Sequence, residues 1–387
     1  MAESVRGRLR WPVRRREEAT AEDIAARDIA QMEVADQLPP PPLEPMEMAE
    51  PPQRFNLAIL RLAGLGLALV LALALTMVKL FVAGPPSVAE LRAQAGVNSW
   101  TTLTIGVKDD QPGIAYYDPG TEECRKRSPA AACGTWSGFD IDIAYMIAED
   151  LGFRRQEVKF YAIESEDRAR MQATDPAHDN QRVPVKMVIA SYSITAGREA
   201  IGAQFSDSYF YTEQSVLTLA GHPKVSSLED LAGQRVCTLS ASTSQDELSP
   251  KQTPPPYTVI AKNKISQCIA ALRSKGSDRV DAVSTDAAIL AGFKSQSPSE
   301  FAHWDLGLDA TEKWGVNVGA DDALKTLVDV TLYRSWKDPH DDRWELAWLH
   351  NVQPEIGKNL PTPIAEADQP PVKRPPVRKL PWEDSLP

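Results

Sequence analysis

The stretch KMVIASYSITAGR, residues 186–198, joins a short apolar run to a polar turn. Its first part, residues 186–191, predicts a buried strand because four apolar residues follow one another there. Its second part places serine and threonine before Arg198, which predicts a strand-to-helix turn whose backbone N–H groups can face an anion. A buried strand that leads into a helix start is the building unit of α/β folds.

The same alternation continues on both sides of this stretch. Apolar residues at Ile143, Met146, Ile147 and Leu151 recur at helical spacing, and Gly152 follows them as a helix end. The other expected strands are 103–107, 158–162, 235–239 and 280–284, and the other expected helices are 228–231, 265–272 and 287–291. We therefore predict an α/β fold with largely parallel sheets, in about 250 residues that can form one large lobe or two small ones.

The composition of the whole chain excludes several classes of protein. With 387 residues and a formal net charge of −11, the chain lacks the basic character of a nucleic-acid-binding domain. Its five histidines are scattered singly, so we expect neither a metal nor another cofactor. The sequence shows no Ser-His-Asp order and no cysteine nucleophile, so we do not expect an enzyme.

Both ends of the chain have the composition of disordered segments. Residues 1–54 begin with six arginines and one acid in the first 16 positions and predict a disordered cytoplasmic arm, with a docking site for a partner as the alternative. Residues 361–387 contain eight prolines and no long apolar run, so we expect a disordered tail. A linker at 85–101 and a globular domain at 102–360 lie between these ends and the membrane segment described next.

Residues 55–84 predict a transmembrane helix. From Leu62 to Val78 the chain runs for 17 residues without a charge, and the flanking Arg61 and Lys79 can extend the span to about 57–82. A cleaved signal peptide is the alternative, but the apolar segment is long and begins far from the first residue. The Arg-rich start favours a cytoplasmic N-terminus, so we expect a single-pass protein of the cell membrane.

Six short motifs follow one another in order along the globular domain. They are LTIGV with DQPG (103–113), GFDIDIA (138–144), SYSIT with Arg198, FSD and Tyr209 (191–209), LEDLAG (228–233), ST (242–243) and VDAVSTD (280–286). In this order and spacing they resemble the family-3 solute-binding proteins, the polar amino-acid receptors of bacterial ABC importers. The resemblance implies a two-lobed Venus-flytrap fold of the type II periplasmic-binding proteins, with the ligand in the cleft. Lobe 1 would comprise about 102–210 and 308–350, lobe 2 about 211–307, and two crossover strands would form the hinge.

The resemblance also assigns roles to charged residues of the cleft. Arg198 would clamp the α-carboxylate of the ligand, for which its planar guanidinium is suited. Asp286, just past a strand end, would pair with the ligand ammonium, although an acid there can also merely cap the next helix. Arg168 matches the residue that reaches the ligand side chain in acidic amino-acid receptors; the alternative is a helix-surface arginine that pairs with Asp167 or Glu164.

Five further polar residues complete the expected site. Ser191 and Ser193 match family positions that contact the ligand. Ser242 and Thr243 stand at a helix start, where they can cap the helix and also face an anion. Asp110 is a further expected ligand contact. The histidine and lysine binders of the family carry an aromatic residue near this position, and its lack here argues against a bulky cationic ligand.

The four cysteines predict two disulfides. Cys124 and Cys133 lie in an insertion at 120–136, which we expect to be a disulfide-closed surface loop. Cys237 on a strand and Cys268 on a helix lie in the same expected lobe, so we predict a bridge between them, with two buried free thiols as the alternative. All four follow the apolar span, and an even number on one side fits an oxidising, extracytoplasmic compartment.

These observations together predict a membrane-anchored extracytoplasmic receptor for a polar, acidic amino acid. Glutamate and aspartate are the first candidates, followed by glutamine and asparagine. The receptor would deliver its ligand to the permease of an ABC importer. The alternative is an amino-acid sensor that signals to a membrane or cytoplasmic partner without transport.

Overall fold

The computed structural model describes residues 57–81, 84–127, 133–175, 181–250, 254–307 and 311–378. The expected arm at 1–54 and the last part of the expected tail, 379–387, lie outside these ranges. The chain divides into two compact units, Met1–Ala68 and Leu69–Pro387. All packing and all sites described below belong to the second unit.

The expected membrane segment forms one helix, α1 (Leu57–Phe81). Its 25 residues span about 37 Å at the usual helical rise, which exceeds the hydrocarbon core of a bilayer. The part Leu57–Lys79 has a mean hydropathy of 2.4, and none of its most apolar window is buried in the fold. By length and composition, α1 is therefore able to cross a membrane.

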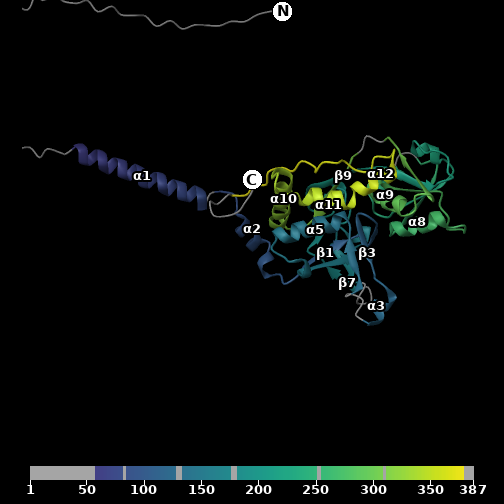
Figure 1. Cartoon of the computed structure of the whole chain (residues 1–387). Coiled ribbons are helices and arrows are strands. Elements are labelled where there is room, and N and C mark those ends of the chain that lie inside the picture. The colour runs from purple at the N-terminus through teal and green to yellow at the C-terminus, as the bar shows by residue number, and fades with distance from the viewer. Residues whose placement is uncertain are drawn as a thin grey trace, which may run out of the picture. The chain divides into compact units, whose positions relative to one another are not determined.

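Strands and helices alternate along the rest of the chain, as the sequence predicts (Figure 1). The strands are β1 (Leu103–Val107), β2 (Asp110–Gln111), β3 (Ala115–Asp118), β4 (Thr135–Ser137), β5 (Val158–Ala162), β6 (Gln172–Asp175), β7 (Gln181–Pro184), β8 (Met187–Val188), β9 (Phe205–Leu219), β10 (Arg235–Leu239), β11 (Thr258–Lys262), β12 (Ala282–Asp286), β13 (Phe301–Asp305) and β14 (Thr311–Asn317). The α-helices after α1 are α2 (Val88–Gln94), α3 (Glu122–Arg127), α5 (Phe139–Asp150), α6 (Ala196–Ala200), α7 (Thr243–Leu248), α8 (Ile265–Arg273), α9 (Ala287–Gln296), α10 (Asp322–Lys337), α11 (Arg343–Asn351) and α12 (Gln353–Asn359). Short 3-10 turns lie at Val97–Ser99, Arg155–Glu157, Ser165–Asp167 and Leu228–Leu231.

Two groups of parallel strands make up the main sheet. In lobe 1, β1 pairs in parallel with β5 and β8; in lobe 2, β10 pairs in parallel with β11 and β12. The strand order β11-β10-β12-β9-β14-β8-β1-β5-β6-β7 joins the two groups through β9 and β14. The α/β prediction is therefore correct, but the expectation of largely parallel sheets is wrong, because the sheet is mixed. The antiparallel pairs are formed by β9 and β14 at the junction of the lobes and by β6 and β7 at the sheet edge.

The long strand β9 belongs to both lobes. Its first part, from Phe205 to Glu213, pairs with β14 of lobe 1. Its second part, from Gln214 to Leu219, pairs with β12 and β13 of lobe 2. The chain returns from β13 to β14 through a connection that includes residues 308–310, which lie outside the described ranges. These two crossings give the two-lobed arrangement of a Venus-flytrap protein.

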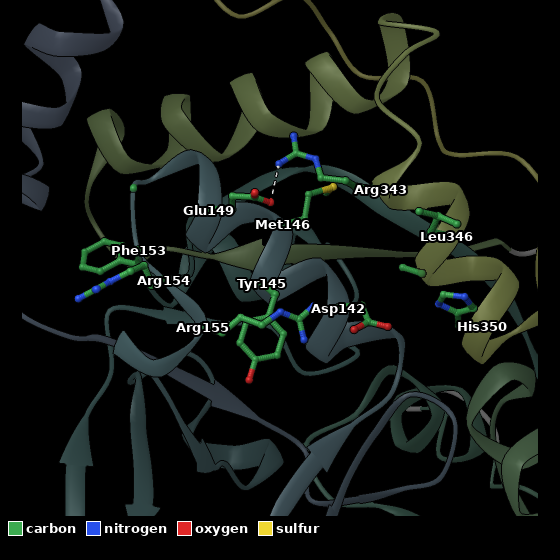
Figure 2. Close-up of a pocket in the computed structure, with 12 residues that line it drawn as sticks. Asp142, Tyr145, Met146, Glu149, Phe153, Arg154, Arg155, Arg343, Leu346 and His350 are labelled. Carbon is green, nitrogen blue, oxygen red and sulfur yellow. Dashed lines mark hydrogen bonds and ion pairs between the residues drawn. The ribbon is translucent and has the colours of Figure 1, made fainter.

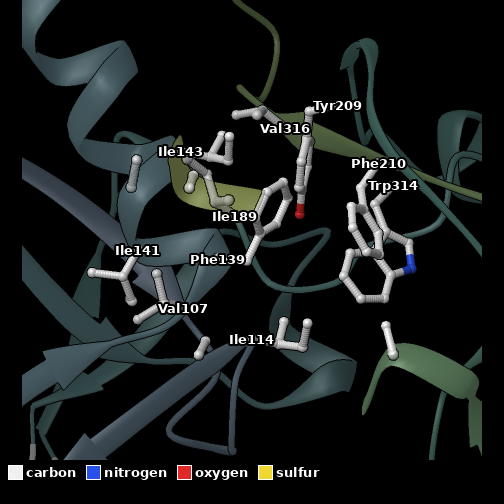
Figure 3. Packing of buried hydrophobic residues seen from close by; sticks show 14 of the residues in the cluster. Val107, Ile114, Phe139, Ile141, Ile143, Ile189, Tyr209, Phe210, Trp314 and Val316 are labelled. Atoms are coloured by element: carbon white, nitrogen blue, oxygen red, sulfur yellow. The ribbon is translucent and has the colours of Figure 1, made fainter. Parts of the chain in front are cut away.

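Aromatic rings fill the core of lobe 1 next to the hinge (Figure 3). The Phe210 ring lies 4.8 Å, centroid to centroid, from the rings of both Phe139 and Trp314. Phe139 begins α5 directly after Gly138, whose φ of +123° only glycine adopts readily. A Cβ at Gly138 would lie 2.4 Å from the Ile114 carbonyl oxygen, which gives the GFD motif a steric reason.

The C-terminal tail differs from its prediction. Residues 361–378, which we call the strap, pack along the globular unit, so the expectation of disorder is wrong for this part. Ile364 and Val372 are almost fully buried, and the Ile364 carbonyl accepts a hydrogen bond from the Thr212 hydroxyl of β9 at 2.7 Å. Proline-rich chain needs no internal hydrogen bonds, so it can run across a surface held by a few anchors that composition does not reveal.

The expected linker at 85–101 is also part of the folded unit. Ser87 and Glu90 form a reciprocal capping box at the start of α2. Leu91 and Val97 are buried in the lobe 1 core. The linker prediction missed this helix because α2 has only seven residues and its single buried turn gives no periodic pattern.

Both predicted disulfides are present in the structure. Cys124 and Cys133 close the surface insertion, and residues 128–132 between them lie outside the described ranges. Cys237 of β10 and Cys268 of α8 form the second bridge within lobe 2, where both side chains are buried. The alternative of two free thiols in lobe 2 is therefore wrong.

Candidate functional site

A cavity between the lobes collects most of the predicted site residues. It is about 10 Å³ in volume, which is room for about one water molecule. Seven of the eight predicted ligand contacts line it, together with three residues that the sequence did not single out, Leu239, Thr285 and Ile289. The seven are Arg168, Ser191, Ser193 and Arg198 from lobe 1 and Ser242, Thr243 and Asp286 from lobe 2.

Ser191 occupies an unusual backbone conformation at the turn after β8. Its φ of +42° lies in the left-handed region, which a residue with a side chain adopts at a cost. The buried Asp140 carboxylate accepts the Ser191 N–H at 2.8 Å and the Tyr209 hydroxyl at 2.9 Å. Burial raises the pKa of Asp140 to about 7, while these two hydrogen bonds oppose that rise. Asp140 and Tyr209 thereby fix the turn, although the sequence assigned them no role.

Gln111 is a second residue that the sequence missed. Its Oε1 accepts the Ser191 hydroxyl at 3.0 Å, and the residue is fully buried. Its Nε2 has no hydrogen-bond partner among the described residues. Gln111 belongs to the DQPG motif, which was recognised in the sequence. The motif does not indicate, however, that the Gln111 amide lies behind the turn that contains Ser191.

Arg198 lies at the lobe 1 wall of the cavity. It belongs to α6, whose first turn is capped by the Thr195 hydroxyl. Its Nη1 donates to the Ser193 carbonyl at 2.5 Å, and its guanidinium carbon lies 4.6 Å from the Tyr192 ring centroid. Burial lowers its pKa from the usual value. These contacts hold a buried guanidinium in place beside the two predicted serines.

Arg168 is buried rather than on a helix surface, so the surface-pairing alternative is wrong. Its guanidinium donates to the carbonyl oxygens of Ser165, Ala190 and Ser191 in lobe 1 and of Ala241 in lobe 2, each at 3.2 Å. Burial and the nearby charge of Arg198 lower its pKa to about 9, so it stays protonated at neutral pH. A single guanidinium therefore bridges the two walls of the cavity.

Asp286 faces these arginines from the end of β12. Its Oδ2 accepts the indole N–H of Trp314 at 2.6 Å. Its side chain makes no capping hydrogen bond to α9, so the capping alternative does not describe it. Burial, followed by the charge of Glu312, raises the pKa of Asp286 to about 7. A cation next to this carboxylate would favour its charged form.

The hydroxyl pair of lobe 2 stands at the start of α7. Ser242 caps this helix by accepting the Gln245 N–H at 3.1 Å, and it donates to the Leu239 carbonyl at 2.7 Å. The Thr243 hydroxyl lies 3.5 Å from the Ser193 hydroxyl across the cavity. Ser242 thus combines the capping role with a place at the cavity wall.

Asp110 is placed differently from its prediction. It does not line the cavity, because its carboxylate accepts the Ser266 N–H at the start of α8, at 2.9 Å. The neighbouring Asp109 forms an ion pair with Lys264 at 2.5 Å. Both contacts join lobe 1 to lobe 2. We call them the interlobe latch, and they show that the lobes touch one another beside the cavity.

No metal centre accompanies the cavity within the described ranges. Among those residues, no group of three or more His, Cys, Asp and Glu side chains could hold a metal ion. The residues that line the cavity contribute two guanidinium groups, five hydroxyl groups and one carboxylate. This set of side chains suits a small ligand that carries both anionic and cationic groups.

Known proteins resemble this chain in sequence and in fold. A model of the bacterial extracellular solute-binding proteins, family 3, matches residues 128–351. A glutamate-binding protein of Corynebacterium efficiens is 29% identical over 277 residues, which cover 69% of this chain and 85% of the relative. An ABC transporter glutamine-binding protein of Bacillus subtilis is 28% identical over 257 residues, which cover 66% and 84%. The crystal structure of a cysteine-binding protein from Campylobacter jejuni has the same fold, with a TM-score of 0.55, 20% identity and coverage of 68% of this chain and 94% of that one.

Proposed function

Because the chain belongs to the bacterial extracellular solute-binding proteins of family 3, we propose that it is a membrane-anchored receptor for an acidic amino acid, glutamate or aspartate, that serves an ABC importer. Amino-acid binding follows from the family and its relatives. We propose in addition that the ligand is acidic, that α1 anchors the protein in the membrane, and that the receptor serves an ABC importer.

The charges of the side chains that line the cavity indicate which amino acid binds there. Among the residues that line it, Arg168 and Arg198 contribute two positive charges and Asp286 contributes one negative charge. Glutamate and aspartate carry two carboxylates and one ammonium, so each charged side chain of the cavity can pair with an opposite charge on the ligand. Glutamine and asparagine would leave one buried guanidinium without a counter-charge, which is costly. A relative named for glutamate binding supports this choice, whereas the relative named for glutamine binding supports only an amino-acid ligand.

Each charged residue then has one role. Arg198 holds the α-carboxylate, Asp286 pairs with the ammonium, and Arg168 reaches the side-chain carboxylate. The carbonyl oxygens that now accept hydrogen bonds from Arg168 are neutral acceptors, whereas a carboxylate forms a charge-assisted bond that is roughly twice as strong.

Ligand entry requires the lobes to separate. A cavity of about 10 Å³ cannot hold an amino acid, and the contact from Arg168 to Ala241 crosses it. Separation about β9 breaks this contact and the interlobe latch, and closure around the ligand restores the latch. Closure also removes water, so the ligand charges interact with the site through a weaker dielectric screen.

The anchor is α1, with the receptor domain outside the cytoplasm. The length and apolar composition of α1 support this, as do two disulfides in the part that follows it. The arginine-rich start of the chain supports a cytoplasmic N-terminus.

One observation favours the sensor as a second candidate. The strap contacts the hinge strand β9, where the Glu366 N–H donates to the Tyr211 carbonyl. It ends at Arg378, whose N–H donates to the Pro86 carbonyl at 3.0 Å, shortly after the end of α1. A movement of the hinge would therefore displace residues next to the membrane segment. A signalling receptor requires such a displacement.

A thermal-shift screen of the full chain in detergent against the twenty amino acids tests the proposed function. Glutamate or aspartate should raise the melting temperature, because a ligand that binds only the folded state stabilises it. The variant Arg198→Ala should lose this shift, whereas Arg273→Ala, which removes an exposed ion pair in lobe 2, should keep it. A chain that no amino acid stabilises would refute the receptor proposal.

A further inference from the structure

A second cavity lies on lobe 1 and shares no residue with the interlobe cavity. It is about 530 Å³ in volume and lies between α5, α11 and the turn at 152–155 (Figure 2). Cavities of this size are typical of ligand sites. The receptor function proposed above gives this cavity no role.

One side of the cavity is apolar. Tyr145 and Met146 of α5, Phe153 of the turn and Leu346 of α11 contribute to its wall. Leu346 is 40% exposed, and Leu349 on the next turn of α11 is 45% exposed. Exposed leucines at this spacing form an apolar strip that an aromatic or aliphatic side chain could cover.

The cavity also contains one cation that lacks an acidic partner. The Arg155 guanidinium carbon lies 4.3 Å from the Tyr145 ring centroid, and no acid pairs with it among the described residues. The other charged groups at the cavity are partnered: Arg343 pairs with Glu149 and Asp150, Arg154 pairs with Glu157, and Asp142 accepts a hydrogen bond from Asn351. The cavity therefore offers a stacked guanidinium with free N–H groups beside an apolar wall.

The chain itself contains a segment of matching chemistry within reach. The described chain ends at Arg378, which pairs with Glu90 of α2 at 2.7 Å. Two residues further along α2, Arg92 donates to the Asp150 carbonyl at 3.3 Å and packs next to Gly152 at the rim of the cavity. The nine residues that follow, KLPWEDSLP at 379–387, can extend to about 30 Å.

We propose that the lobe 1 cavity binds residues 379–387 of the same chain. Trp382 covers the apolar wall at Leu346 and Tyr145, and a carboxylate of Glu383 or Asp384 forms a charge-assisted fork with Arg155. The strap would then be fixed at both ends, at the hinge and on lobe 1. A tethered segment has an effective concentration of about 1 mM or more, so a modest intrinsic affinity is enough to fill the cavity.

A peptide-binding experiment tests this assignment. A full chain that stops after Arg378 is titrated with a fluorescent KLPWEDSLP peptide, and the peptide anisotropy is measured. We expect binding with a Kd below about 0.1 mM, and at least about tenfold weaker binding by the untruncated chain, whose own tail competes at an effective concentration of about 1 mM. Arg155→Ala in the truncated chain should weaken binding at least fivefold, whereas Arg170→Ala, an exposed arginine outside the cavity, should not change it. Absence of binding, or binding that Arg155→Ala leaves unchanged, would overturn the proposal.

A cross-linking experiment tests the same contact in the full-length chain. The pair Trp382→Cys and Leu346→Cys should form a disulfide in high yield under mild oxidation, as read by peptide mass mapping. The control pair Trp382→Cys and Lys224→Cys, with the second position on lobe 2, should not. Equal yields for the two pairs, or a tail peptide that binds lipid vesicles but not the truncated protein, would contradict a docked tail.

Discussion

The carboxylate of Asp140, at the start of α5, accepts the backbone N–H of Ser191, in the turn after β8, at a distance of 2.8 Å. This bond joins a helix start to the turn that brings Ser191 and Ser193 to the interlobe cavity. Since the left-handed conformation of Ser191 costs energy by itself, the turn depends on the acceptor that Asp140 supplies.

Removal of this acceptor should destabilise the protein. Asp140→Ala leaves the Ser191 N–H and the Tyr209 hydroxyl unpaired in a buried place, so the free energy of unfolding should fall by about 2–4 kcal/mol. Asp140→Asn keeps one acceptor oxygen and should lose less. Denaturant unfolding measures both, with the exposed Glu149→Ala on the same helix as control. Equal losses for Asp140→Ala and Glu149→Ala would show that the turn does not need Asp140.

Asp286 should lower the free energy of unfolding at neutral and higher pH, although it contributes to ligand binding. Its pKa is raised to about 7 in the folded protein, so the folded state holds its proton more tightly than the unfolded chain does. The free energy of unfolding should therefore fall by about 3–4 kcal/mol from this group as the pH rises from 4 to above 7. Asp286→Asn should remove that decrease and be more stable than the natural chain at pH 8, yet bind the amino acid more weakly. Unfolding at pH 4, 6 and 8 checks this, and identical pH profiles for the two proteins would contradict it.

The interlobe latch should tune the apparent affinity without contacting the ligand. Lys264→Ala removes a partly exposed ion pair to Asp109, which is worth about 0.2–1 kcal/mol. The closed form should lose up to about fivefold in population, and the apparent Kd should rise by the same factor. Small-angle scattering and calorimetry measure these two changes. Arg273→Ala, which breaks an ion pair within lobe 2, should alter neither; equal effects of the two variants would exclude a latch.

The strap should contribute to the stability of the folded unit. Ile364→Ala empties a buried position and should reduce the free energy of unfolding by about 2–4 kcal/mol. Leu360→Ala, a few residues earlier and 71% exposed, is the matched control and should change it by less than about 0.5 kcal/mol. If the two variants unfold at the same denaturant concentration, the strap is not anchored at Ile364.

Motifs with a strict local requirement were predictable from the sequence. The strands at 103–107, 158–162 and 235–239 match β1, β5 and β10, since each is an apolar run between turns. The strand expected at 186–191 is shorter in the structure, where β8 covers only Met187–Val188. The chain turns away from the sheet there to carry its serines to the cavity.

Long-range relationships were not predictable. Trp314 donates to Asp286 from a strand in the other lobe, and nothing near either residue in the sequence indicates the pair. Asp110 was expected at the ligand, but its carboxylate accepts the Ser266 N–H of α8 instead, and nothing near Asp110 in the sequence indicates this contact between the lobes. The folded strap was not predicted because a few isolated buried residues, such as Ile364 and Val372, hold it in place. The proline content of the segment does not reveal them.

Calorimetric titration with glutamate and glutamine, on the natural chain and on Arg168→Met and Arg168→Lys, is the sharpest test of an acidic ligand bound by Arg168. We expect the natural chain to prefer glutamate over glutamine by about 10- to 100-fold, because of one charge-assisted contact. Arg168→Met should abolish this preference while still binding glutamine, and Arg168→Lys should retain part of it. The ratio of the two Kd values is the readout, because a general loss of stability affects both ligands alike. A preference for glutamate that survives in Arg168→Met would contradict the assignment of the site.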